Sequence, residues 1–402
     1  MEQVNRLSTH QRIWVGIDAG KGHHWAVAID AEGSRLLSRK VVNDEAEILD
    51  LIADVCGLAD EVRWAVDISS RPSALLLALL LGHDQEVVYI PGRTVNRMSG
   101  AFAGDHKTDA KDAQTIAETA RMRSDFRALE LAPDLVGELA LLTSYRANMT
   151  GDRVKMINRL RELLVGICPA LERSFEFRKR PGLVLVSGYC TPSALRRMGV
   201  GRLTAWLAKR DIRNASYFAH KAVEAAKSQT TSLPGEKRAA ALASDLARQI
   251  LDLDERIKRI DREIADVLGQ DERGAIIQSM PGMGPLLTAE FIALAGDLSA
   301  YRDAGHLASH AGIAPVARDS GKRTNNNRRP RHYSRRLCRL FYLSAQSALL
   351  RPGASQEYYR RKRAEGMIHP QAVLCLARQR INVLWAMLRD GRPYAHPVPG
   401  AA

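Results

Sequence analysis

The sequence has no long apolar run and few cysteines. The longest apolar run, Ala74 to Leu81, is far shorter than the roughly 20 residues that a bilayer-spanning helix needs. Residues 1–11 are polar, so no signal peptide is expected. Five cysteines form no C-x-x-C pair, which argues against a zinc site and a disulfide framework. We therefore expect a cytoplasmic protein with reduced thiols and no membrane partner.

Aromatic residues and acidic residues are also scarce. Aromatic side chains make up 5% of the chain, and 45 Asp and Glu stand against 59 Lys and Arg, a net charge of +14. This excess of positive charge favours a polyanionic partner, with nucleic acid ahead of an anionic membrane. The low aromatic content indicates contact with the nucleic-acid backbone more than stacking on bases.

Among the acids that are present, four aspartates stand out. Asp18 and Asp67 each end a hydrophobic run, and Asp109 and Asp112 lie three residues apart at the predicted start of a helix. Each could be a solvated strand end, or a helix acid favoured by the macrodipole. Their joint placement favours a site for Mg²⁺, with Mn²⁺ as a substitute, because clustered carboxylates repel one another without a cation.

Residues 1–130 alternate strand and helix signals. Strands are predicted at 12–18, 24–30, 35–42, 61–67 and 86–90, and helices at 44–57, 71–82 and 109–123. This order, β-β-β-α-β-α-β-α, is that of the ribonuclease-H superfamily, in which the first and fourth strands are neighbours. Asp18 and Asp67 would then face each other, and the last helix would add Asp109 and Asp112.

Residues 131–272 are predicted to be helical. Between Leu242 and Val267, apolar residues recur every three or four positions with charges between them, which is typical of a coiled coil. A less regular stripe runs from Leu135 to Leu163. The two helices could pair within one chain or across a dimer. The stretch 170–232 gives no clear pattern.

Residues 273–390 form a third, mostly helical region, and 391–402 is expected to be a loose tail. The region opens with a Pro-Gly-x-Gly motif at 281–284, followed by an apolar helix to about Ala295. The motif is a simple turn before that helix, or else Gly282 and Gly284 offer backbone N–H groups to DNA phosphates. A packing helix is predicted at about 370–389.

A strongly basic segment follows in the same region, opposed only by Asp319, and it includes Asn325 to Asn327. We favour a nucleic-acid groove over a solvated face. The candidate nucleic-acid contacts in it are Arg318, Lys322, Arg323, Arg328, Arg329, Arg331, Arg335 and Arg336.

Ser320 lies inside this basic segment. A serine beside a glycine is usually a turn residue. Here Arg318, Lys322 and Arg323 flank it and could hold a phosphate, so the hydroxyl could be a nucleophile if a group accepts its proton. The histidines near these motifs, His23 and His24 among them, have no assigned role.

These motifs together resemble the insertion-sequence 110 family of transposases. The N-terminal part of the resemblance is Val15-Gly16-Ile17-Asp18, Val66-Asp67, Val88-Tyr89-Ile90-Pro91-Gly92-Arg93 and Lys107-Thr108-Asp109-Ala110-Lys111-Asp112-Ala113. The C-terminal part is Pro281-Gly282-Met283-Gly284-Pro285, Ala311-Gly312-Ile313-Ala314-Pro315 and Ser320-Gly321. The combined motifs extend over most of the chain and are specific for this family, although each motif alone would be weak evidence.

The resemblance implies a DNA recombinase with a RuvC-like DEDD domain over 1–130 and a transposase domain over 273–390. Its metal ligands would be Asp18, Asp67, Asp109 and Asp112, and its nucleophile would be Ser320. A bridge RNA would pair with donor and target DNA. Dimers would join into a tetramer in which different protomers share a site. The protein would be bacterial, cytoplasmic and associated with the nucleoid when bound to DNA.

Two departures and two alternatives remain. The second acid is often Glu in this family but is Asp67 here, and residues 322–331 are unusually rich in Asn and Arg. One alternative is a RuvC-like Mg²⁺-dependent nuclease, such as a junction resolvase, that uses water. The other is a non-enzymatic nucleic-acid-binding scaffold whose acids are structural.

Overall fold

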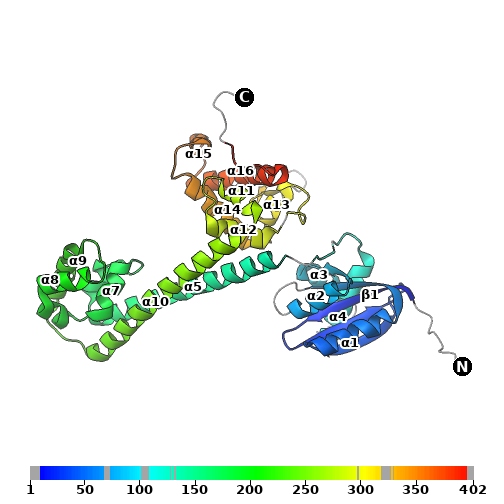
Figure 1. Ribbon diagram of the computed structural model, residues 1–402, viewed down its shortest axis with the longest axis horizontal. Helices are drawn as coiled ribbons and strands as arrows, with labels where there is room; N and C mark the ends of the chain where they lie inside the picture. Colours follow the sequence, from blue (N-terminus) through cyan, green and yellow to red (C-terminus); the bar gives the residue numbers. More distant parts are fainter. Residues whose placement is uncertain are drawn as a thin grey trace. The chain divides into compact units, whose positions relative to one another are not determined.

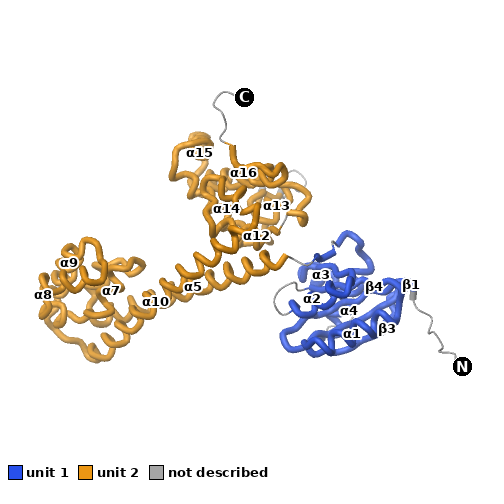
Figure 2. Tube along the Cα trace, viewed as in Figure 1, with its two compact units in different colours: residues 1–132 blue, residues 133–402 orange. Residues whose placement is uncertain are grey.

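The computed structural model describes residues 10–67, 73–100, 108–126, 128–130, 133–296, 298–317, 327–328 and 330–395. The chain divides into two compact units, residues 1–132 and residues 133–402 (Figure 2). The first unit holds a five-stranded sheet with helices, and the second is mostly helical. The predicted combination of an α/β N-terminal part and a helical remainder is confirmed. No helix in the described ranges is long and apolar enough to cross a membrane.

The sheet of the first unit has the strand order β3-β2-β1-β4-β5. β1, β2 and β3 form an antiparallel meander, whereas β4 and β5 run parallel to β1. The predicted meander and the predicted pairing of the first and fourth strands are both confirmed. The strands are β1 (His10–Ala19), β2 (His23–Ile29), β3 (Arg35–Val42), β4 (Ala59–Val66) and β5 (Glu86–Tyr89).

Helices cover both faces of this sheet (Figure 1). Alternate β1 residues, Ile13, Val15 and Ile17, share a core with α1 and α2 on one face. On the other face, α3 and α4 pack against Ala65 and Val88. The helices are α1 (Glu45–Cys56), α2 (Ala74–Gly82), α3 (Gly92–Ser99) and α4 (Asp109–Met122). Helix α3 was not predicted, because only one of its side chains is buried and no apolar repeat marks it.

Helix α4 lies directly on the backbone of β1. A Cβ atom added to Gly16 would come within 2.1 Å of the Ala113 carbonyl oxygen and 2.3 Å of the Ala117 nitrogen. Only glycine allows this approach, because any side chain would push the helix away. The helix starts at Thr108, whose hydroxyl accepts the Lys111 backbone N–H at 3.3 Å.

The second unit is organised by two long helices, α5 (Asp134–Ile167) and α10 (Glu236–Leu268), which lie side by side (Figure 1). Arg146 pairs with Asp261, and one heptad further along Arg153 pairs with Asp254; the second Nη2–Oδ2 distance is 3.0 Å. From the first ion pair to the second, the residue number increases on α5 and decreases on α10, so the two helices are antiparallel. Of the two arrangements left open by the sequence, the structure has the pair within one chain.

Two separate cores occupy the two ends of this helix pair. One contains the C-terminal half of α5 and the first half of α10, packed with four short helices from the stretch that sequence analysis could not interpret. Gly188 lies so close to Trp206 that an added Cβ would come within 2.4 Å of the indole ring. The four helices are α6 (Pro169–Ser174), α7 (Arg180–Gly188), α8 (Pro192–Ala208) and α9 (Ala215–Lys227).

The other core joins the start of α5 and the end of α10 to the C-terminal helices, with Phe291 and Phe341 in edge-to-face contact at its centre. The predicted helices ending near Ala295 and spanning 370–389 are confirmed. The elements are α11 (Glu272–Gln278), α12 (Pro285–Ala295), α13 (Ala304–His310), β6 (Val316–Ala317), β7 (Asn327–Arg328), α14 (Arg335–Ala348), α15 (Ala354–Ala364) and α16 (His369–Asp390).

The beginning of the tail differs from expectation. A loose segment was predicted from Gly391 onward, but the Tyr394 backbone N–H donates to the Ser279 hydroxyl at 2.7 Å. This contact holds the first residues after α16 against the end of α11. Residues 396–402 lie outside the described part of the chain.

Candidate functional site

The two strand-end acids lie on neighbouring parallel strands. β1 and β4 pair with Ile17 opposite Val66, so Asp18 and Asp67 follow at the same edge of the sheet. Because Ile17 and Val66 fill the core under α1 and α2, the next residue on each strand faces the side that α4 covers. Both aspartates are half-buried there.

The first turn of α4 carries the other two acids. Asp109 is exposed and Asp112 is half-buried. The His23 Nε2 atom lies 3.5 Å from the Asp109 carboxylate. Since His23 begins β2, beside the last residues of β1, this contact places the start of α4 at the sheet edge that carries Asp18. The topology therefore brings all four predicted acids to one end of the sheet.

Asp67 has the most unusual electrostatic environment of the four. Its Oδ1 atom is buried and has no hydrogen-bond partner in the described residues. Burial raises the pKa of Asp67, and the nearby negative charge of Asp112 raises that pKa further. Hydrogen bonds from the backbone N–H groups of Asp67 and Ala19 oppose the increase. A buried, unpartnered oxygen beside a second carboxylate fits a cation ligand.

The side chains do not yet form a complete coordination shell. Within the described ranges, no three His, Cys, Asp or Glu side chains are grouped closely enough to hold a metal ion. Asp67 lies within electrostatic range of Asp112, and Asp109 lies beside His23. A bound cation would have to draw these carboxylates together.

Two histidines, neither of which had a predicted role, belong to this region. His23 is brought to Asp109 by the turn between β1 and β2. His24 is 1% exposed, and burial lowers its pKa below the ordinary value. The sequence hinted at this only through two adjacent histidines, His23 and His24, that follow Asp18 by five and six residues.

Much of the predicted C-terminal site lies outside the described residues, namely Ser320, Arg318, Lys322, Arg323 and Arg329. The described residues on either side of this segment form a short antiparallel pair. Val316 of β6 lies opposite Arg328 of β7, and Ala317 opposite Asn327. The segment with Ser320 therefore connects two paired strands.

The described part of the basic segment is exposed and carries uncompensated charge. Arg328, Arg331, Arg335 and Arg336 are all exposed, and none forms an ion pair with a described carboxylate. Arg335 and Arg336 occupy the first turn of α14, where the helix macrodipole disfavours cations. Because Arg335 and Arg336 lie where the helix dipole repels cations, an anionic ligand bound there would compensate for this repulsion.

The Pro-Gly-x-Gly motif is a tight turn fixed by packing. Gly282 has φ +84°, and an added Cβ would come within 2.5 Å of the Ser344 carbonyl oxygen on α14. Arg380, which is 3% exposed, donates to the Pro281 carbonyl at 2.5 Å and to the Ser344 hydroxyl at 2.7 Å. Burial lowers the pKa of Arg380 to about 10. The backbone conformation and the close packing therefore explain why residue 282 is glycine, whereas a Cβ at Gly284 would meet no atom within 4 Å.

Two family models match the chain, and together they cover both predicted regions. Residues 15–169 match the DEDD model of IS110 elements, described as a transposase. Residues 274–360 match the model described as "Transposase IS116/IS110/IS902 family". All four aspartates fall in the first match and Ser320 in the second. The protein is a transposase, an enzyme that recombines DNA, and a DEDD domain implies a need for a divalent metal.

Similar proteins extend over the whole chain. It is 62% identical to an insertion element IS116 protein of Streptomyces clavuligerus, covering 97% of this chain and 98% of that protein. An IS900 protein of Mycobacterium paratuberculosis is 47% identical, and the match covers 98% of this chain and 99% of that protein. An IS110 protein of Streptomyces coelicolor is 33% identical over 96% of each. The chain therefore belongs to the IS116/IS110/IS902 family of insertion-element transposases.

Proposed function

We propose that this transposase exchanges DNA strands through a covalent phosphoserine link at Ser320, with Mg²⁺ held by Asp18, Asp67, Asp109 and Asp112. Mn²⁺ would be a substitute. One observation carries the metal assignment: at the carboxyl ends of parallel strands, a buried Asp67 oxygen near Asp112 has no hydrogen-bond partner in the described part of the chain. The strand order of the first unit, which is that of ribonuclease-H and RuvC-like domains, supports it.

In the proposed chemistry, the Ser320 oxygen attacks the phosphorus of a DNA phosphodiester. The bond from phosphorus to one deoxyribose oxygen breaks, and that oxygen leaves as a hydroxyl carrying the serine's proton. A hydroxyl of another strand then attacks the phosphoserine, which restores Ser320 and joins the new strand. Arg318, Lys322 and Arg323 would stabilise the charge that develops on the phosphate. The bound cation would neutralise phosphate oxygens and favour loss of the serine proton.

We further propose that a bridge RNA selects donor and target DNA. The net charge of +14 and the exposed arginines of α14 support a large polyanionic ligand. A dimer that joins into a tetramer would let the acids of one protomer and the serine of another act together. The proposed domains are RuvC-like over 1–130, coiled coil over 131–272 and transposase over 273–390, with a tail over 391–402.

One incubation of protein, candidate guide RNA and DNA with Mg²⁺, run on a denaturing gel, tests the chemistry. The wild type should give a denaturant-stable protein–DNA adduct and rejoined strands. Ser320→Ala should bind DNA normally and give no adduct, whereas the control Ser193→Ala, an exposed serine of α8, should behave as wild type. Asp112→Asn should stop cleavage with little loss of binding.

The same gel separates the two alternatives. Cut DNA without an adduct, unaffected by Ser320→Ala, would show a nuclease that uses water. Binding that is equal with and without Mg²⁺, and no cut strand under any condition, would show a scaffold. Either result would replace the phosphoserine proposal.

A further inference from the structure

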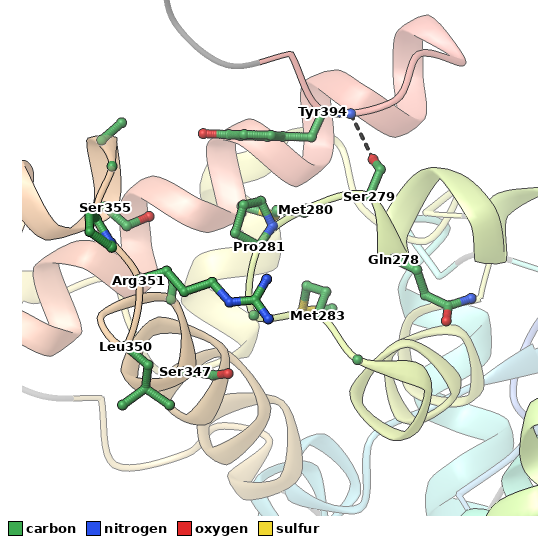
Figure 3. Close-up of a pocket in the computed structure, with 16 residues that line it drawn as sticks. Gln278, Ser279, Met280, Pro281, Met283, Ser347, Leu350, Arg351, Ser355 and Tyr394 are labelled. Atoms are coloured by element: carbon green, nitrogen blue, oxygen red, sulfur yellow. Dashed lines mark hydrogen bonds between the residues drawn. The ribbon is translucent and has the colours of Figure 1, made fainter.

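A cavity of about 670 Å³ opens within the second unit (Figure 3). Three segments line it: the turn at 278–284, the end of α14 with the loop that follows it at 347–355, and Tyr394 of the tail. All of these residues are described, and none of them is acidic. The cavity is therefore suited to a ligand that carries negative charge.

The walls of this cavity are held in place before any ligand arrives. The turn is closed by a hydrogen bond from the Met283 N–H to the Met280 carbonyl at 3.0 Å. The buried Arg380 anchors Pro281 from behind, and Ser279 holds the backbone of Tyr394. A preformed site binds its ligand with little ordering cost.

The lining combines one cation, one aromatic ring and several neutral polar groups. Arg351 is exposed and has no ion pair with a described residue. Figure 3 shows its guanidinium reaching toward Pro281 and Met283, with the ring of Tyr394 on the far side of Pro281 in this view. The Gln278 amide and the Ser347 and Ser355 hydroxyls complete the polar lining. An arginine, a tyrosine ring and hydrogen-bonding side chains match the phosphate, base and edge of a nucleotide.

We propose that this cavity takes one unpaired nucleotide of the bound nucleic acid, with its base against Tyr394 and its phosphate at Arg351. The inference rests on the proposed function, since it assumes a nucleic-acid ligand, but it does not depend on Ser320 chemistry. A phosphate alone would leave most of a 670 Å³ space unfilled. A base inside an intact duplex cannot reach a pocket, whereas an unpaired base can leave its stack.

Equilibrium binding by the full-length protein tests this assignment. The probes are labelled 15-residue strands of thymidine and of uridine and a 15-base-pair duplex of mixed sequence, at several salt concentrations. Tyr394→Ala should weaken single-strand binding by about 5-fold to 100-fold, and Tyr394→Phe should keep it. Arg351→Ala should also weaken it and should lower the slope of log K against log salt by about 0.7. Duplex binding should change less than 2-fold.

Two residues at the other end of the second unit supply matched controls. Tyr217, which is 58% exposed on α9, and Arg238, exposed on α10, should tolerate alanine with unchanged binding. Full single-strand affinity in both Tyr394→Ala and Arg351→Ala, or an equal loss on duplex and single strands, would overturn the inference. The thymidine and uridine strands tell whether DNA or RNA supplies the nucleotide.

Failure of this inference can be told apart from failure of the proposed function. The phosphoserine adduct of the wild-type protein is scored on the same preparations. A normal adduct together with unchanged single-strand binding in the variants would remove the nucleotide pocket and keep the recombinase chemistry. Selective loss of single-strand binding without any adduct would keep the pocket and remove the chemistry.

Discussion

At the scale of single residues, Asp67 is the position where folding and function conflict most. Its carboxylate is partly buried and lies near Asp112, and one of its oxygens has no hydrogen-bond partner among the residues that the structure describes. Such a group destabilises the cation-free protein whenever it is ionised. A cation bound between Asp67 and Asp112 would offset this cost, because its charge would counter both carboxylates.

The prediction for Asp67→Asn concerns stability with and without cation. In the cation-free protein the substitution should not destabilise and should raise the midpoint of thermal unfolding at pH 7, because it removes a buried charge. The stabilisation that Mg²⁺ or Mn²⁺ gives the wild type should be lost. Thermal melts with and without the cation measure both effects. The control is Asp60→Asn, an exposed aspartate of β4.

The raised pKa of Asp67 also predicts how the stability of the protein changes with pH. Because the pKa of Asp67 is raised in the folded protein, the folded state binds its proton more tightly than the unfolded state. Stability should therefore fall as the pH rises from the ordinary aspartate pKa through the raised value. Asp67→Asn should flatten this fall. An identical fall in the variant, or a Mg²⁺ effect that survives the substitution, would contradict the assignment.

The positions of the four aspartates at two strand ends and one helix start could be predicted, because local sequence patterns mark such ends. The contact of His23 with Asp109 could not be predicted, since it joins residues 86 positions apart through the sheet register. The structural reason for Gly282 was also hidden, because the backbone it touches belongs to α14, at Ser344 and Ala348. Contacts between segments that are far apart in the sequence leave no local sequence pattern.

At the scale of elements, the packing of α4 on β1 positions the acidic first turn. The helix can lie over the strand because Gly16 has no side chain. This contact sets the distance of Asp109 and Asp112 from the strand-end acids. The proposed metal site would therefore depend on a glycine that is not itself a ligand.

Gly16→Ala should destabilise the protein by about 3 kcal/mol, because the new methyl group would meet the α4 backbone at Ala113 and Ala117. It should also weaken cation binding by displacing the first turn. Urea denaturation measures the first effect, and Mn²⁺ titration measures the second. Gly82→Ala, at a helix end with open space around it, should stay within about 1 kcal/mol of wild type. Equal stability of the two variants would mean that α4 does not sit on β1 in this way.

Elements with a regular apolar pattern could be predicted, and irregular ones could not. The meander, α4 and the long helices follow periods of two or of three to four residues. By contrast, α7 is only nine residues long and begins Arg-Pro-Gly, and α8 is interrupted at Gly199, where φ is +64°. Both helices are held by a core that they share with α5, α6, α9 and α10, and contacts between such distant segments leave no local pattern in the sequence.

At the scale of the whole molecule, the excess of positive charge is the property that most directly reports on the ligand. The exposed Arg335 and Arg336 carry part of it at a helix start that repels them. Each phosphate contact made by such a side chain releases condensed counterions from DNA. The chain should therefore bind DNA with a steep dependence on salt.

The double variant Arg335→Ala/Arg336→Ala should lower the slope of log K against log salt for duplex DNA by about 1.8, or about 0.9 for each phosphate contact. Its unfolding midpoint should not fall, because the removed cations oppose the macrodipole of α14. Arg238→Ala serves as the control with an unchanged slope. An unaltered slope in the double variant would show that DNA does not contact these two arginines.

Composition alone predicted the class of ligand, and the motifs predicted the family. The division into two units could not be predicted, because it depends on the long-range pairing of α5 with α10. The first unit ends at residue 132, and the end of α10 shares one core with the C-terminal helices. Sequence patterns mark elements better than they mark the cores those elements share.

The central claim is that the carboxylates of the first unit and the hydroxyl of Ser320 act on one DNA phosphate. The most direct measurement is peptide mapping by mass spectrometry of the protein after reaction with DNA, guide RNA and Mg²⁺. We predict a nucleotide phosphate on Ser320 that is absent after chelation and absent in Asp112→Asn. A nucleotide on another residue, or one on Ser320 that forms equally well without the cation and without Asp112, would contradict the account.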